Sequence, residues 1–84
     1  MESFAIEKEF SPQYPVSLVE QITEFLTNAI IDGKLENGQR LIENELQRKF
    51  RISRGPIRES FRILEKKGLV VIIPRKGTFV RKIT

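Results

Sequence analysis

Apolar residues in the first half of the chain recur every three or four positions, the spacing of one face of an α-helix. Ser17 and Glu20 form a capping-box sequence ahead of the first such stretch, and Gly33 is a typical helix stop after it. The pattern therefore predicts a helix that begins after Ser17 and buries one apolar face. That face consists of Leu18, Ile22, Phe25, Leu26, Ala29 and Ile30.

Two shorter helices are predicted downstream, joined by the very short segment Arg51-Ile52. The first of them covers residues 43–50 and follows the turn dipeptide Asn37-Gly38. The second covers residues of about 53–67, with Ser53 as its N-cap. The expected inward side chains are Leu46 and Phe50 in the former and Ile57, Phe61 and Leu64 in the latter.

The period of the pattern changes after Gly68. Residues 69–73 are apolar and mostly β-branched, residues 74–77 have turn chemistry, and residues 78–81 return as a second strand. The predicted order of elements is helix, helix, tight turn, helix and hairpin. This is the order of a winged helix-turn-helix, a mainly α fold of three helices with a small β-hairpin as the wing.

The length of 84 residues suffices for one domain. We expect it over residues 16–84, preceded by an N-terminal arm over residues 1–15 that contains Pro12 and Pro15. Apolar and polar side chains alternate between residues 4 and 10, which allows a short edge strand in the arm.

Charge is divided unevenly along the chain. Residues 1–33 contain one base and six acids, a net charge of −5, whereas residues 34–84 contain 14 bases and five acids, a net charge of +9. Bases gathered in one part of a chain with a pI of 9.8 are typical of a nucleic-acid binder. A basic surface that is merely solvated would give the same composition.

Three arginines give the third helix a second stripe. Arg54, Arg58 and Arg62 are spaced four residues apart and so share one face, roughly opposite the apolar one. A row of guanidinium groups suits the major groove of DNA, where arginine pairs with guanine O6 and N7. The alternative is a solvated helix face on which these arginines pair with Glu59 and Glu65.

Further basic and small residues surround this stripe. Arg48 and Lys49 on the second helix could contact phosphates, as could the free backbone N–H groups around Ser53. Gly55 would permit close approach of the backbone to DNA. The hairpin adds a second basic cluster, which consists of Arg75, Lys76, Arg81 and Lys82.

The chain resembles the GntR family of bacterial regulators, and its FadR-like branch most closely. The resemblance covers about residues 16–81 and rests on Asp32-Gly33-Lys34-Leu35, Gly38-Gln39-Arg40-Leu41, Glu43, Leu46, Ile52-Ser53-Arg54-Gly55-Pro56-Ile57-Arg58-Glu59 and Leu64-Glu65-Lys66-Lys67-Gly68-Leu69-Val70. It implies that Arg58 contacts base edges, that Ser53 and Arg54 lie near the DNA backbone, and that Gly77, at the wing tip, approaches the minor groove.

Four positions depart from the family pattern. Asn37 replaces a usual proline, and Gly55 replaces a common threonine. Arg51 stands where glycine is usual, and a left-handed backbone there would cost about 1 kcal/mol. Asn44 stands where some members carry a DNA-contacting arginine, so that role is not transferred.

The family also implies a C-terminal domain that binds an effector and dimerises. We therefore expect a fragment of a longer, homodimeric regulator of a pseudo-palindromic operator, itself monomeric or weakly dimeric.

The residues that are absent exclude several other functions. Without cysteine or histidine the chain can form no disulfide and no Ser–His or Cys–His pair, so we expect no enzyme, no metal site and no cofactor. No apolar run approaches the roughly 20 residues of a membrane span, and no signal peptide opens the chain, which predicts a cytoplasmic protein without a membrane partner. Docking of an acidic protein and RNA binding remain alternatives to double-stranded DNA.

Overall fold

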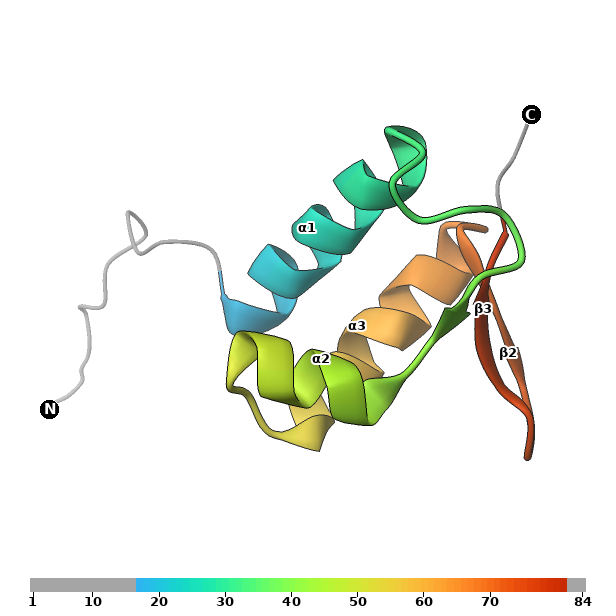
Figure 1. Ribbon diagram of the computed structural model, residues 1–84. Helices are drawn as coiled ribbons and strands as arrows, with labels where there is room; N and C mark the ends of the chain where they lie inside the picture. The colour runs from blue at the N-terminus through green and yellow to red at the C-terminus, as the bar shows by residue number, and fades with distance from the viewer. Residues whose placement is uncertain (1–16, 82–84) are drawn as a thin grey trace, which may run out of the picture.

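The computed structural model describes residues 17–81 and shows three helices and a small sheet (Figure 1). The elements follow the chain as α1 Leu18–Ile31, β1 Arg40–Leu41, α2 Glu43–Phe50, α3 Arg54–Lys66, β2 Val70–Ile73 and β3 Gly77–Val80. The predicted winged helix-turn-helix is therefore confirmed. The arm and its possible edge strand lie outside the described residues, as does Lys82.

Helix α1 begins at the predicted capping box. The Ser17 hydroxyl oxygen accepts from the Glu20 backbone N–H at 3.2 Å, and the Ser17 N–H donates to the Glu20 carboxylate at 3.0 Å. The width predicted for its buried face is wrong, because Leu18 and Phe25 are 45% and 49% exposed. Both lie at one margin of the apolar face, beyond the stripe that enters the core. The Phe25 ring packs instead against the Phe50 ring in an edge-to-face arrangement, with centroids 5.4 Å apart.

Helices α2 and α3 are joined by a left-handed residue. Arg51 has φ 58° and ψ 48°, so this chain places an arginine where the backbone favours glycine. Ser53 occupies the predicted N-cap position of α3, but its side chain makes no capping hydrogen bond. The C-cap residue of α2, Arg51, and the N-cap residue of α3, Ser53, are thus only two positions apart.

The sheet has three antiparallel strands in the order β1-β3-β2, one more than predicted. Arg40 pairs with Phe79 and Leu41 with Thr78, which fixes the segment before α2 to the wing. The two hairpin strands are confirmed, although β2 begins at Val70 and β3 covers Gly77–Val80, about one residue away from the predicted bounds.

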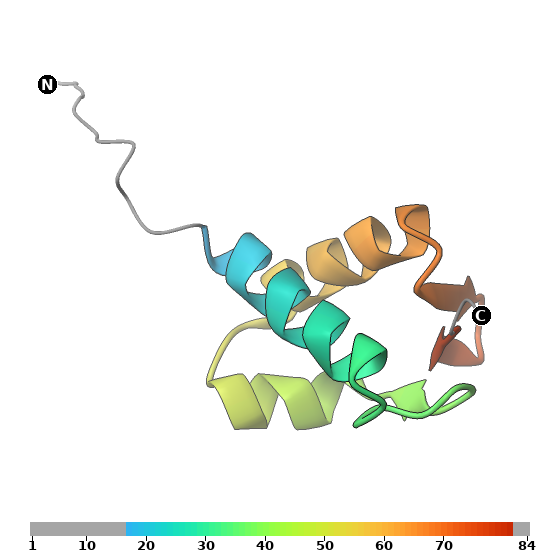
Figure 2. The same ribbon diagram turned by 90° about the horizontal axis from the view of Figure 1, so that it is seen from above.

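The core lies between α1, α3 and the sheet, and α3 packs against α1, α2 and β2. Figure 2 shows the sheet at one end of the helices. Leu46 and Phe50 of α2 are partly buried and pack against this core. Because α3 buries its apolar stripe, its remaining surface faces solvent beside the wing. The fully or almost fully buried apolar residues are Ile22, Leu26, Ile30, Leu41, Ile57, Phe61, Leu64, Val70 and Val80.

Candidate nucleic-acid interface

The arginine stripe lies on the solvent side of α3, as its spacing predicts. Arg54, Arg58 and Arg62 are all exposed, and the side chains of the first two are 55% and 54% accessible. The burial of Ile57, Phe61 and Leu64 on the inner side fixes which way the stripe points. The tertiary fold therefore presents these guanidinium groups outward.

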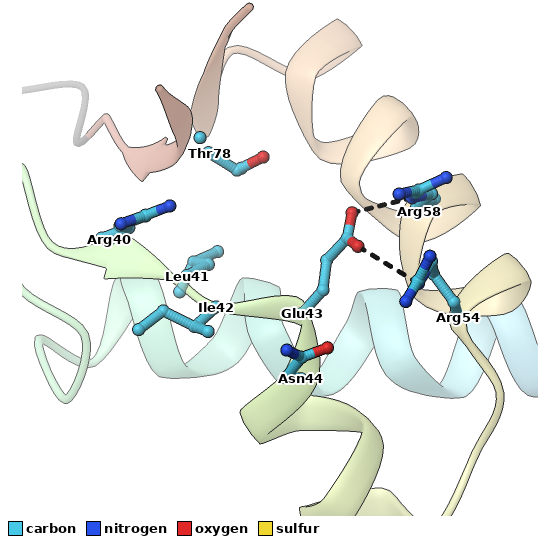
Figure 3. A pocket seen from close by; sticks show the side chains of 9 residues that line it. Arg40, Leu41, Ile42, Glu43, Asn44, Arg54, Arg58 and Thr78 are labelled. Carbon is cyan, nitrogen blue, oxygen red and sulfur yellow. Dashed lines mark hydrogen bonds and ion pairs between the residues drawn. The ribbon is translucent and has the colours of Figure 1, made fainter. Parts of the chain in front are cut away.

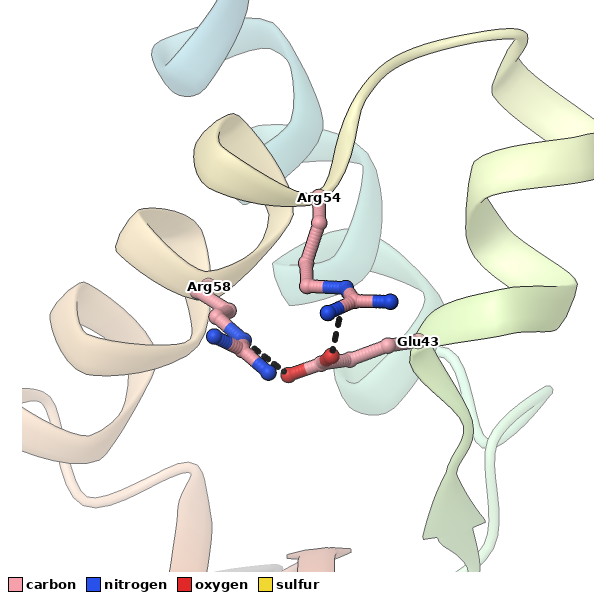
Figure 4. A network of polar contacts seen from close by, with 3 residues as sticks. All are labelled: Glu43, Arg54 and Arg58. Atoms are coloured by element: carbon pink, nitrogen blue, oxygen red, sulfur yellow. Dashed lines mark hydrogen bonds and ion pairs between the residues drawn. The ribbon is translucent and has the colours of Figure 1, made fainter.

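A carboxylate of α2 joins two of these arginines (Figure 4). Arg58 Nε donates to Glu43 Oε2 at 3.0 Å, and Arg54 Nε lies 3.8 Å from Glu43 Oε1. Neither Glu59 nor Glu65 forms an ion pair with the stripe within the described part of the chain, so the helix-internal pairing is wrong. Glu43 belongs to the residues that carry the family resemblance, but nothing in its local sequence indicates this contact.

The network borders a hollow of about 340 Å³ between the helices and the sheet (Figure 3). Three arginines and one glutamate line it, so its charge is net positive. A second hollow, of about 220 Å³, adjoins it and brings Arg62 and Ile72 to the same concave surface. We call this surface the α3–wing groove. The residues around the first hollow are Arg40, Leu41, Ile42, Glu43, Asn44, Arg54, Arg58, Gly77 and Thr78.

Gly77 lies beside Arg40, a residue that the sequence pattern did not indicate as part of the interface. It is the first residue of β3 and pairs with Ile73, so the tip of the wing consists of residues 74–76 and does not include Gly77. Its φ is 130°, and a Cβ added there would lie 2.8 Å from Arg40 Nε. Arg40 enters the groove because β1 pairs with β3, and a two-residue strand leaves no periodic signal in the sequence.

The remaining predicted contact residues surround the groove without lining it. Ser53 and Gly55 are exposed at the start of α3, and Arg75 and Lys76 are exposed in the wing turn. Arg48 is exposed on α2, one turn after Asn44. A Cβ added to Gly55 would meet no atom within 4 Å, so the fold itself does not require glycine at this position.

The described helices are too short to cross a lipid bilayer.

The sequence profile of "Bacterial regulatory proteins, gntR family" matches residues 18–80. The chain belongs to the GntR family.

Relatives within the GntR family have regulatory names. The HTH-type transcriptional repressor RspR of Escherichia coli (strain K12) is 35% identical over 79 residues, which cover 94% of this chain and 34% of RspR. The chain thus spans about one third of the length of the curated relatives it matches. These names agree with the expectation of a regulator and not an enzyme.

Solved structures support the same assignment. A putative GntR regulator from Rhodococcus sp. RHA1 superimposes with a TM-score of 0.77 at 36% identity, covering 82% of this chain and 33% of that one. The DNA-binding domain of AraR in complex with operator ORR3 superimposes with a TM-score of 0.75 at 30% identity, covering 84% of this chain and 87% of that one. The similarity to the AraR domain thus extends over most of both chains.

Proposed function

We propose that this chain is the double-stranded DNA-binding domain of a GntR-type transcription regulator, with α3 as the recognition helix. The observation that carries the proposal is the exposed arginine stripe, which lines the net positive groove between α3 and the wing. The similarity to a domain solved in complex with an operator supports the same conclusion.

In this proposal α3 enters the major groove, and Arg58 pairs with a guanine. Backbone phosphates are contacted from the second helix and from the start of α3, and the wing lies on the adjacent backbone or minor groove. Contacts with the backbone or groove edges are assigned to Arg48, Ser53, Arg54, Gly55, Arg62, Arg75, Lys76 and Gly77.

The proposal extends to branch, domain organisation and assembly. The run Ser53-Arg54-Gly55-Pro56-Ile57-Arg58-Glu59 supports the FadR-like branch. Residues 16–84 would form the DNA-binding domain and residues 1–15 an arm. The matched relatives are about three times longer than this chain, which supports a further domain in the full-length regulator. The proposal includes a homodimer, formed through a C-terminal domain, on a pseudo-palindromic operator in the bacterial cytoplasm.

Fluorescence anisotropy with a labelled duplex across a salt series tests DNA binding. Each phosphate that the protein neutralises adds about 0.9 to the slope of log K against log salt concentration, so several groove contacts predict a steep decline. Lys67→Ala is a charge-matched control, because Lys67 lines a hollow with Glu20 and Glu24 on the α1 side of α3. A flat salt response at micromolar protein would contradict the proposal, as would a Lys67→Ala effect equal to that of Arg58→Ala on a duplex selected from a random pool by this chain.

A further inference from the structure

Glu43 is the one acidic residue among the described side chains that line the two hollows of the α3–wing groove. A carboxylate at the centre of a surface that binds phosphates repels the backbone of DNA. Its side chain is 30% exposed, less than those of the two arginines beside it. A carboxylate in this position weakens the affinity for any DNA duplex. We therefore expect Glu43 to contribute to the discrimination between DNA sequences.

The geometry of the contact indicates what that role is. Glu43 Oε2 accepts from Arg58 Nε, and this is the one hydrogen bond that the Arg58 guanidinium makes within residues 17–81. Both terminal amino groups of that guanidinium are therefore available to a ligand. Guanine O6 and N7 lie side by side and accept two parallel hydrogen bonds, which the two terminal amino groups of one arginine can supply.

We propose that Glu43 is a positioning residue that raises sequence specificity at the expense of non-specific affinity. It fixes Arg58 through Nε, so that the outer end of the guanidinium is ordered before DNA arrives. It restrains Arg54 at longer range through its other oxygen. Ordering a long side chain beforehand removes an entropy cost that would otherwise fall on the cognate complex. This inference rests on the proposed DNA-binding function.

The experiment compares affinities for two duplexes, one selected from a random pool by the 84-residue chain and one of scrambled sequence. Glu43→Gln removes the charge and weakens the hold on Arg58. We expect it to bind the scrambled duplex at least as tightly as the parent chain, while the ratio of selected to scrambled affinity falls by about tenfold.

Two further variants separate positioning from charge. Glu45→Gln makes the same change in the same first turn of α2, but Glu45 is exposed and does not line the groove. It should strengthen binding to both duplexes equally and leave the ratio unchanged. Glu43→Asp keeps the charge and the favourable interaction with the helix N-terminus but shortens the side chain. It should lower the ratio without tightening scrambled binding.

A measurement on the unmodified chain keeps the inference testable if a variant is unstable. In ¹H–¹⁵N spectra of the free protein, the Arg58 Nε–H should exchange with water more slowly than that of Arg62, for which no ion pair exists within residues 17–81. Arg58→Lys assigns the signal by its loss. Equal exchange at Arg58 and Arg62 would overturn the positioning role.

The two levels of the proposal fail in different ways. If the unmodified chain does not distinguish the selected from the scrambled duplex, the proposed function is wrong. If the unmodified chain does distinguish them, and Glu43→Gln keeps the same ratio as Glu45→Gln, only the positioning role of Glu43 is wrong.

Discussion

Ser60 donates its hydroxyl hydrogen to Thr23 across the contact between α3 and α1. The two oxygens are 2.8 Å apart, and both residues are buried. The direction follows from the neighbouring contact, because the Thr23 hydroxyl already donates to the Val19 carbonyl oxygen at 2.7 Å. This buried hydrogen bond joins one hydroxyl group of α3 to one of α1. It therefore helps to fix the orientation of α3 on α1, and with it the face that α3 exposes to DNA.

Ser60→Ala should lower the free energy of unfolding by about 1 kcal/mol, because it removes a buried hydrogen bond. Ser60→Val should cost more, about 1–3 kcal/mol, because an added methyl group overpacks a residue of 0% exposure. Urea denaturation measures both. Ser53→Ala is the control: Ser53 is exposed and makes no capping hydrogen bond, so its change should stay within about 0.5 kcal/mol. An equal loss at Ser53 and Ser60 would contradict this account.

Arg51→Gly should raise stability by up to about 1 kcal/mol, because it relieves the strain of a non-glycine residue at φ 58°. The gain is limited because glycine also increases the entropy of the unfolded chain. Arg48→Gly removes the same side chain in the regular part of α2 and should cost about 1 kcal/mol. Thermal unfolding of the two variants should thus shift in opposite directions, and a destabilised Arg51→Gly would show that the Arg51 side chain outweighs the strain.

Gly77→Ala should weaken DNA binding through Arg40. The new Cβ would clash with Arg40 Nε at 2.8 Å and move the guanidinium away from the groove. We expect a loss of several-fold in the parent chain and a much smaller loss in an Arg40→Ala background. The backbone strain at φ 130° is common to both backgrounds and cancels in this double-mutant cycle. Equal losses in the two backgrounds would contradict a role through Arg40 and would assign the effect to the backbone of Gly77 itself.

Local signals in the sequence account for the helices and the hairpin. Helical periodicity, the Ser17 capping box and the change of period after Gly68 predict element positions because they depend on neighbours within four residues. Strand β1 gives no such signal, since two residues have no period. The exposure of Phe25 has no local signal either, because the width of a buried face depends on which helix covers it.

The candidate interface also contains features that the local sequence predicts and features that it does not. The outward direction of Arg58 follows from the spacing of its own helix. Its partner does not, because Glu43 lies 15 residues earlier and meets Arg58 only once α2 and α3 have packed. Arg40 likewise reaches Gly77 through the register of β1 with β3. Contacts that depend on tertiary packing are therefore the ones that sequence patterns miss.

The final prediction distinguishes base recognition from backbone contact. Arg58→Ala should cost about 1–3 kcal/mol on a selected duplex and relax the preference at one base pair, because it removes two hydrogen bonds to a guanine. Binding to scrambled DNA should change little. Lys76→Ala, in the exposed wing turn, should weaken selected and scrambled duplexes equally and lower the salt slope by about one.

The ratio of selected to scrambled affinity at fixed salt is the deciding measurement, with Lys67→Ala as the charge-matched control on the opposite side of α3. Arg58→Ala should lower the ratio, whereas Lys76→Ala and Lys67→Ala should leave it unchanged. If Arg58→Ala leaves the ratio intact but weakens both duplexes, then Arg58 contacts phosphate. The Glu43 carboxylate would in that case hold a backbone contact, and base recognition would have to come from another residue of the groove, with Arg54 and Arg40 the next to be substituted.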